Sequence, residues 1–161
     1  DSAMLWTRAA APGELSLEVA ESGDFKDAPS LPSGKVGEDT DLTAKVVVGG
    51  LKAGTEYHYR FRAGGEVSPA GTFRTAFAAG DRREVTLGFT GDADWKWKPY
   101  PLLSTLAKEK LDLFVFLGDL IYETRNLRGT ASAESLDEYR WKYRENREPR
   151  PGTTLTEVPM H

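Results

Sequence analysis

Two aspartates, each following a glycine at the end of an apolar run, are the residues of this sequence best suited to chemistry. Asp92 lies in the string GDAD after the run 85–90, and Asp119 lies in the string GDLIYE after the run 113–117. Both runs read as buried strands, so each carboxylate is expected at the carboxyl edge of a sheet, where open α/β proteins bind ligands. Two such carboxylates on neighbouring strands can point at one place, which is how hard or borderline metal ions are held.

The same turns have a plainer interpretation, because an aspartate after a strand often caps the following helix. Two such turns on adjacent strands favour a shared site over two separate caps. The stretch between Asp92 and Asp119 is long enough for one strand–helix–strand crossover. Asp94 is a second choice for the carboxylate of the first turn.

The elements that would position these aspartates follow from the pattern of residues 79–161. We expect strands at 85–90 and 113–117, joined by a helix at 100–110, and a right-handed crossover of this kind makes the two strands parallel. The strands are apolar almost throughout, as is typical when both faces of a sheet are covered. Because two or three strands cannot cover their own faces, we expect this half to be part of a larger domain.

A further helix is predicted from Leu136 to about Arg147. Ser135 and Glu138 form a capping-box pattern at its start. An apolar stripe is expected to face the protein, and the charged residues between its members to form a solvated face with i,i+4 pairs. The stripe consists of Leu136, Tyr139 and Tyr143.

The first half of the chain, residues 1–78, has the short alternating runs and Gly- or Pro-rich turns of a β-sandwich. Within the segment 51–61, Tyr57 fits the tyrosine-corner position of a fibronectin type III-like domain, where the hydroxyl bonds to nearby backbone. His58 is expected to be a solvated side chain rather than a ligand. The module is short for seven strands, so we expect it to lack its first strand and residues to be missing before Asp1.

Composition excludes several classes of protein. The 161 residues are 39% hydrophobic and 29% charged, which is typical of a folded chain. The net charge of −4 gives no indication of nucleic-acid recognition. There is no cysteine, which excludes disulfides, thiolate metal sites and a cysteine nucleophile. No apolar run approaches the length of a transmembrane segment. A nucleotide-binding fold is disfavoured because neither turn has a glycine-rich phosphate loop.

The string GDLIYE at 118–123 resembles the second motif of calcineurin-like metallophosphoesterases, and in particular that of the alkaline phosphatase D family. The string YPLLSTLA at 100–107 and the string LWTR at 5–8 are also similar to that family. This resemblance implies an all-β, fibronectin type III-like sandwich at 1–78, followed at 79–161 by the amino-terminal part of an α/β metallophosphoesterase domain.

The resemblance also implies a role for single residues. Asp119 corresponds to a carboxylate that bridges two metal ions, and Asp92 to the first-motif carboxylate on one of them. Tyr122 corresponds to a phenolate ligand of ferric iron, with a packing aromatic as the alternative. The implied cofactors are two metal ions, iron with calcium, manganese or zinc. Together they would supply the hydroxide that attacks phosphorus.

Trp95 and Lys96 lie beside Asp92 and are expected to contact a phosphate ester substrate, together with Trp97 and Lys98. An exposed loop anchored by its aromatic side chains is an equal alternative. Many alkaline phosphatase D members have a cysteine in the first motif. Its absence here favours an all-oxygen ligand set and leaves the metal pair open.

The later motifs of the family bring further Asn, Asp and His ligands. The candidates after Tyr122 are Asn126, Asn146 and His161, and none lies in a matching motif. The final residues resemble the stretch before the family's Asp-Asp-His motif, so we expect the chain to stop short of the third ligand set. We therefore predict that residues 1–161 alone do not hydrolyse phosphate esters.

Two functions remain open at this stage. The first is hydrolysis of phosphate mono- or diesters by the full-length form of a secreted or periplasmic alkaline phosphatase D-type enzyme. The second is a non-catalytic β-sandwich that binds or adheres to a partner, with the Gly-Asp turns acting only as helix caps. The substrate, the metal identity and the oligomeric state are not indicated by these residues.

Overall fold

The computed structural model describes residues 1–94, 97–98, 100–124 and 132–147. The described part is mostly β, with three small sheets and two short α-helices. It divides into two compact units, Asp1–Arg83 and Glu84–His161. No helix among the described residues is long and apolar enough to cross a membrane.

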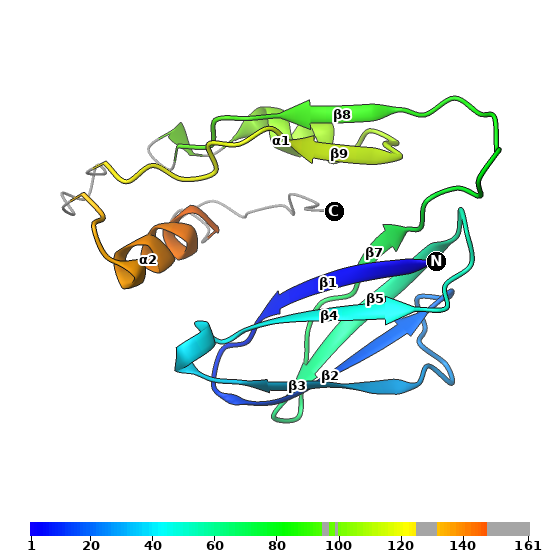
Figure 1. The fold of residues 1–161 in the computed structure, drawn as a ribbon, viewed down its shortest axis with the longest axis horizontal. Coiled ribbons are helices and arrows are strands. Elements are labelled where there is room, and N and C mark those ends of the chain that lie inside the picture. Colours follow the sequence, from blue (N-terminus) through cyan, green and yellow to red (C-terminus); the bar gives the residue numbers. More distant parts are fainter. Residues whose placement is uncertain (95–96, 99, 125–131, 148–161) are drawn as a thin grey trace. The chain divides into compact units, whose positions relative to one another are not determined.

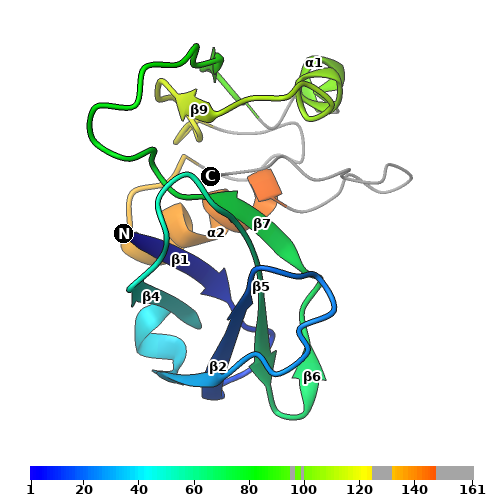
Figure 2. The same ribbon diagram turned by 90° about the vertical axis from the view of Figure 1, so that its right-hand side faces the viewer.

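The first unit contains two antiparallel sheets (Figure 1). In the smaller sheet, β1 pairs with β4, so that Leu5 lies opposite Val46. In the larger sheet, β2 lies between β3 and β5, and both β6 and β7 pair with β5 (Figure 2). The strands are β1 (Ser2–Arg8), β2 (Gly13–Ala20), β3 (Ser30–Val36), β4 (Thr43–Gly49), β5 (Glu56–Ala63), β6 (Glu66–Val67) and β7 (Gly71–Arg74), with a 3-10 turn, η1 (Glu38–Thr40), before β4.

Seven strand segments fit into residues 1–78 because β6 is only two residues long and the turn before it is tight. That turn contains two glycines with positive φ, Gly64 at 55° and Gly65 at 89°, a conformation that glycine adopts without strain. Two of these segments, β6 and β7, pair with the same strand, β5, and the expectation that the module lacks its first strand stays a prediction.

The core of the first unit lies between its two sheets. Leu17 of β2 is fully buried and packs with Leu5 of β1, Val48 of β4 and Phe61 of β5. A second group, at the other end of β2, joins Leu15 to Val36 of β3. The alternation of apolar and polar residues along β2 and β5 therefore places one face of each strand in the core.

Tyr57 confirms the expected tyrosine corner. Its hydroxyl accepts a hydrogen bond of 3.0 Å from the backbone amide of Lys52, five residues upstream. Its ring is buried and stacks on Phe73 of β7. The neighbouring His58, expected to be solvated, is partly buried beside Gly23.

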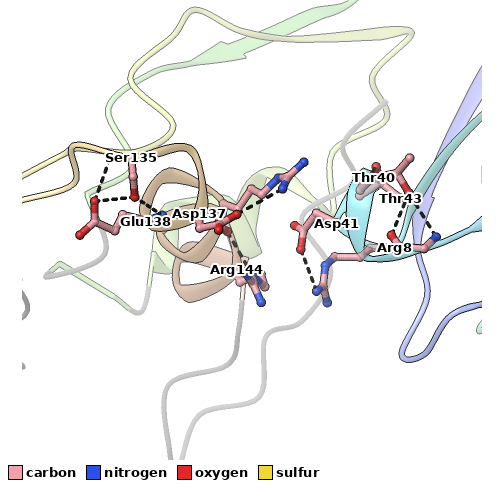
Figure 3. Close-up of polar contacts among 10 residues, drawn as sticks. Arg8, Thr40, Asp41, Thr43, Ser135, Asp137, Glu138 and Arg144 are labelled. Atoms are coloured by element: carbon pink, nitrogen blue, oxygen red, sulfur yellow. Dashed lines mark hydrogen bonds and ion pairs between the residues drawn. The ribbon is translucent and has the colours of Figure 1, made fainter.

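Glu18 departs from the alternating pattern, because it lies on the opposite face of β2 from Leu17 and yet is buried. Its carboxylate accepts hydrogen bonds from Arg60 and, at 2.8 Å, from Nε of Arg62, both on β5. Both bonds hold the pKa of Glu18 below its ordinary value, and the bond from Arg62 has the larger effect. A second ion pair joins Arg8 at the end of β1 to Asp41 after η1, at 3.2 Å (Figure 3).

The second unit contains the expected strand–helix–strand arrangement. Strand β8 (Leu87–Thr90) pairs in parallel with β9 (Leu113–Phe116), and α1 (Pro101–Leu106) connects them. The helix is shorter than the predicted 100–110, because turn structure begins at Ala107. Helix α2 (Leu136–Arg147) has the predicted range. Its capping box is confirmed: Ser135 N donates to Glu138 at 2.8 Å, and Glu138 N approaches the Ser135 hydroxyl at 3.4 Å (Figure 3).

Among the described residues, the faces of β8 and β9 are only partly covered, which agrees with the expectation that so few strands cannot cover their own faces. Gly88 and Phe114 are buried, but Leu87 and Leu113 are half exposed and Phe89 is 63% exposed. A two-stranded sheet with one short helix has too little structure to cover both faces.

Candidate metal centre

The two Gly-Asp turns lie side by side because the parallel strands before them are hydrogen bonded to their ends. After the last paired residues, Leu117 N donates to Thr90 O at 2.7 Å. The pairing then continues through the turns themselves. Asp92 N donates to Gly118 O at 3.2 Å, and Ala93 N donates to Asp119 O at 2.8 Å. The main chain thus fixes the two aspartates as neighbours.

Tyr122 brings the two carboxylates to one place. Its hydroxyl lies 2.8 Å from Oδ1 of Asp92 and 3.3 Å from Oδ2 of Asp119. The two carboxylate oxygens therefore cannot be further apart than the sum of those distances. The three residues that the sequence singled out as metal ligands come together in the fold, and all three offer oxygen atoms.

Both aspartates have an uncommon backbone conformation. Asp92 has φ of 61° and Asp119 has φ of 58°, in the left-handed region that few non-glycine residues adopt. Gly118, with φ of 120°, turns the chain immediately before Asp119. Uncommon φ values of this kind cluster at functional sites, where the surrounding structure enforces them.

Electrostatics at this place favour a positive charge. The hydrogen bond to Asp92 raises the pKa of the Tyr122 hydroxyl, and burial and the charge of Asp119 act in the same direction. The phenol is thus held neutral between two carboxylates. A cation bound to the same oxygens would reverse this balance, because it stabilises both the carboxylates and a phenolate.

The donor set fits a hard metal ion. Carboxylate oxygens are typical ligands of calcium, magnesium and manganese, and a tyrosine oxygen is known as an iron ligand in haem proteins. The described residues contain no group of three or more His, Cys, Asp or Glu side chains able to hold a metal. A metal ion held by Asp92, Asp119 and Tyr122 would therefore need further ligands.

The other residues singled out from the sequence have separate positions. The backbone carbonyl of Asp94 accepts a hydrogen bond of 3.0 Å from Trp97 N. Trp97 is 71% exposed, whereas Lys98 is buried. Trp95, Lys96, Asn126 and His161 lie outside the described residues, so their expected roles stay predictions.

Sequence reasoning missed how the site is supported. Asn146, considered only as a ligand, instead donates from Nδ2 to Ala93 O at 2.8 Å and to Leu120 O. Tyr100 lies with its hydroxyl 2.9 Å from Ala93 O and 2.8 Å from Oδ1 of Asn146. Asn146 lies in the last turn of a charged helix, where its neighbours in sequence do not indicate that it contacts residues of the two turns.

Comparisons with known proteins show which proteins this chain resembles. Residues 1–77 match the family described as "PhoD-like phosphatase, N-terminal domain". The first part of the chain is therefore similar to the N-terminal domain of PhoD-like phosphatases, and the two Gly-Asp turns lie after the matched residues.

The chain is homologous to alkaline phosphatase D of Bacillus subtilis (strain 168). The two are 32% identical over 91% of this chain and 29% of the relative. A solved structure, titled "Structure of PhoD", matches with a TM-score of 0.79 and 27% identity, over 91% of this chain and 33% of that one. The chain therefore spans about a third of the length of the proteins that it matches.

Proposed function

We propose that this chain contributes part of a metal centre to a phosphatase of the alkaline phosphatase D type, which hydrolyses phosphate mono- or diesters. The observation that carries the proposal is the hydroxyl of Tyr122, which contacts carboxylates from two separate turns. Homology to alkaline phosphatase D over 91% of the chain supports the same class. On this proposal, residues 1–78 are a fibronectin type III-like sandwich and 79–161 begin a calcineurin-like domain.

Asp92, Asp119 and Tyr122 would hold the metal ions, iron with calcium, manganese or zinc. Bound metals of this kind supply Lewis acidity toward phosphoryl oxygens and lower the pKa of water to near neutrality. In this proposal, the described residues of the chain serve to position the ligand carboxylates. Its parallel strands and the backbone bonds between the turns hold the carboxylates in place before a metal arrives. Preorganised charge of this kind stabilises a transition state without rearrangement during the reaction.

The competing function, a binding module in which the aspartates only cap helices, has less support. Helix α1 begins at Pro101, and its N-cap residue is Tyr100, without a side-chain cap bond. Asp92 lies well before that helix and faces Tyr122 instead. On the proposed phosphatase function, the protein is secreted or periplasmic.

The test uses the complete polypeptide that carries these residues. Purified protein loaded with Mn²⁺ or Fe³⁺ should hydrolyse p-nitrophenyl phosphate or bis-p-nitrophenyl phosphate, and a chelator should abolish turnover. Asp119→Asn should lower kcat by at least about 100-fold, since it removes a charged ligand. Asp137→Asn, on the exposed start of α2, is the matched control and should keep parent activity. Parent-like turnover by Asp119→Asn would reject the proposal.

A further inference from the structure

Helix α2 has its polar side, rather than its apolar stripe, toward the rest of the second unit. The predicted stripe is exposed: Leu136 is 66% accessible, and Tyr139 and Tyr143 are also exposed. The buried residues of the helix are Lys142 and Glu145. The sequence-based assignment of its two faces is therefore wrong, and the contacts that replace it are polar.

The contacts of α2 reach both Gly-Asp turns. Asn146 Nδ2 donates to the carbonyl of Ala93, which directly follows Asp92, and to the carbonyl of Leu120, which directly follows Asp119. One amide group thus ties together the two residues next to the candidate ligands. The bond between Ala93 N and Asp119 O joins the same two segments from the main-chain side.

The hydrogen-bonding capacity of Asn146 matches this position. Its NH₂ group has two donors for two carbonyls, and its Oδ1 lies 2.8 Å from the hydroxyl of Tyr100. Aspartate in its place would lack both donors and would bring a negative charge against two carbonyl oxygens. Burial, followed by the charges of Asp94 and Asp92, raises the pKa of Tyr100, so its hydroxyl keeps the proton it donates.

Two lysines support the same docking. Lys98, buried in the loop after Asp92, donates from Nζ to Glu145 O at 2.9 Å, in the last turn of α2. A cation there is favourable because the C-terminal end of a helix has a partial negative charge. Lys142 donates to Thr124 O at 2.8 Å, in the segment after Asp119. Helix α2 is therefore attached to the segments that follow both turns.

We propose that Asn146, assisted by Tyr100, is a positioning residue that fixes the separation of the Asp92 and Asp119 carboxylates for metal binding. The inference rests on the proposed function, because it assigns Asn146 to the support of that same site. Residues that orient metal ligands without touching the metal commonly change metal affinity by about 10- to 100-fold when they are replaced.

The experiment compares the complete polypeptide with its variants Asn146→Asp, Tyr100→Phe and Tyr143→Phe. Calorimetry measures the Kd for Mn²⁺, and hydrogen exchange measures protection of the Asp92 and Ala93 amides. We expect Asn146→Asp to weaken Mn²⁺ binding by about 10- to 100-fold and to speed exchange at both amides. Tyr100→Phe should give a smaller change in the same direction. Tyr143→Phe, an exposed tyrosine on the same helix, should match the parent.

The outcomes separate the inference from the proposed function. Parent-like Mn²⁺ affinity in folded Asn146→Asp overturns the positioning role, even if exchange becomes faster, because the contact then serves the fold alone. If circular dichroism shows that Asn146→Asp does not fold, Tyr100→Phe decides: weakened Mn²⁺ binding supports the role, and unchanged binding overturns it. A parent protein that binds no Mn²⁺ at all rejects the proposed function, and the positioning role with it.

Discussion

Different forces stabilise the interior of each of the two units. The first unit has a continuous apolar core between two sheets, with Leu17 and Val36 essentially inaccessible. In the described part of the second unit, the largest buried side chains apart from Phe114 are those of Lys98, Lys142 and Glu145. The comparison teaches that the first unit is stabilised mainly by burial of hydrocarbon, and that the second positions its turns mainly by hydrogen bonds.

The largest expected effect is a cavity in the first core. Leu17→Ala should reduce the free energy of unfolding of the first unit by about 3 kcal/mol, because it removes a fully buried side chain. Leu117→Ala, in the second unit at an exposed position, should change stability by less than about 0.5 kcal/mol. Urea unfolding measures both. Equal losses for the two variants would contradict the contrast between the units.

A smaller effect is expected at the tyrosine corner. Tyr57→Phe keeps the stacked ring and removes the acceptor of the Lys52 amide, so it should cost about 1 kcal/mol. Tyr143→Phe on α2 provides the comparison at an exposed site and should be neutral. The same urea titrations measure the difference, and a neutral Tyr57→Phe would mean that the hydroxyl makes no net contribution.

The smallest effect is a difference in acid sensitivity. The bonds from Arg62 and Arg60 lower the pKa of Glu18, and those from the Glu134 amide and Ser135 lower that of Glu138, both from 4.5. Each ionised carboxylate therefore stabilises its unit above pH 4.5, and this stabilisation is lost as the pH falls through the lower folded-state pKa.

The two carboxylates should act on different units. Glu18→Gln should flatten the acid dependence of the first unit, and Glu138→Gln that of α2. Hydrogen exchange at pH values from 3 to 6, resolved by segment, distinguishes the two. A Glu18→Gln protein whose first unit keeps the full acid dependence would show that this ion-paired cluster does not act as described.

The sequence was most informative where a residue pattern maps directly onto geometry. Period-two alternation identified the buried faces of β2 and β5, and the capping box identified the start of α2. The Gly-Asp strings identified Asp92 and Asp119, because a strand followed by a tight turn places its next side chain at the sheet edge. These features depend only on neighbours in sequence.

The failures arose where distant residues decide the outcome. The stripe of Leu136 and Tyr143 had the correct helical spacing, yet the helix is docked through Lys142 and Asn146 instead. Likewise Glu18 is buried because Arg60 and Arg62 lie on the adjacent strand, which the pattern of β2 alone does not reveal. Partners that come from elsewhere in the fold leave no periodic signal in the local sequence.

Anomalous diffraction from crystals of the complete polypeptide grown with Mn²⁺ tests the proposed metal centre most directly. The expected result is an anomalous peak about 2.0–2.6 Å from carboxylate oxygens of Asp92 and Asp119, the range for hard cations bound to oxygen. A map with no peak beside these carboxylates, although Mn²⁺ is bound elsewhere in the protein, would contradict the proposal that these two turns form a metal site.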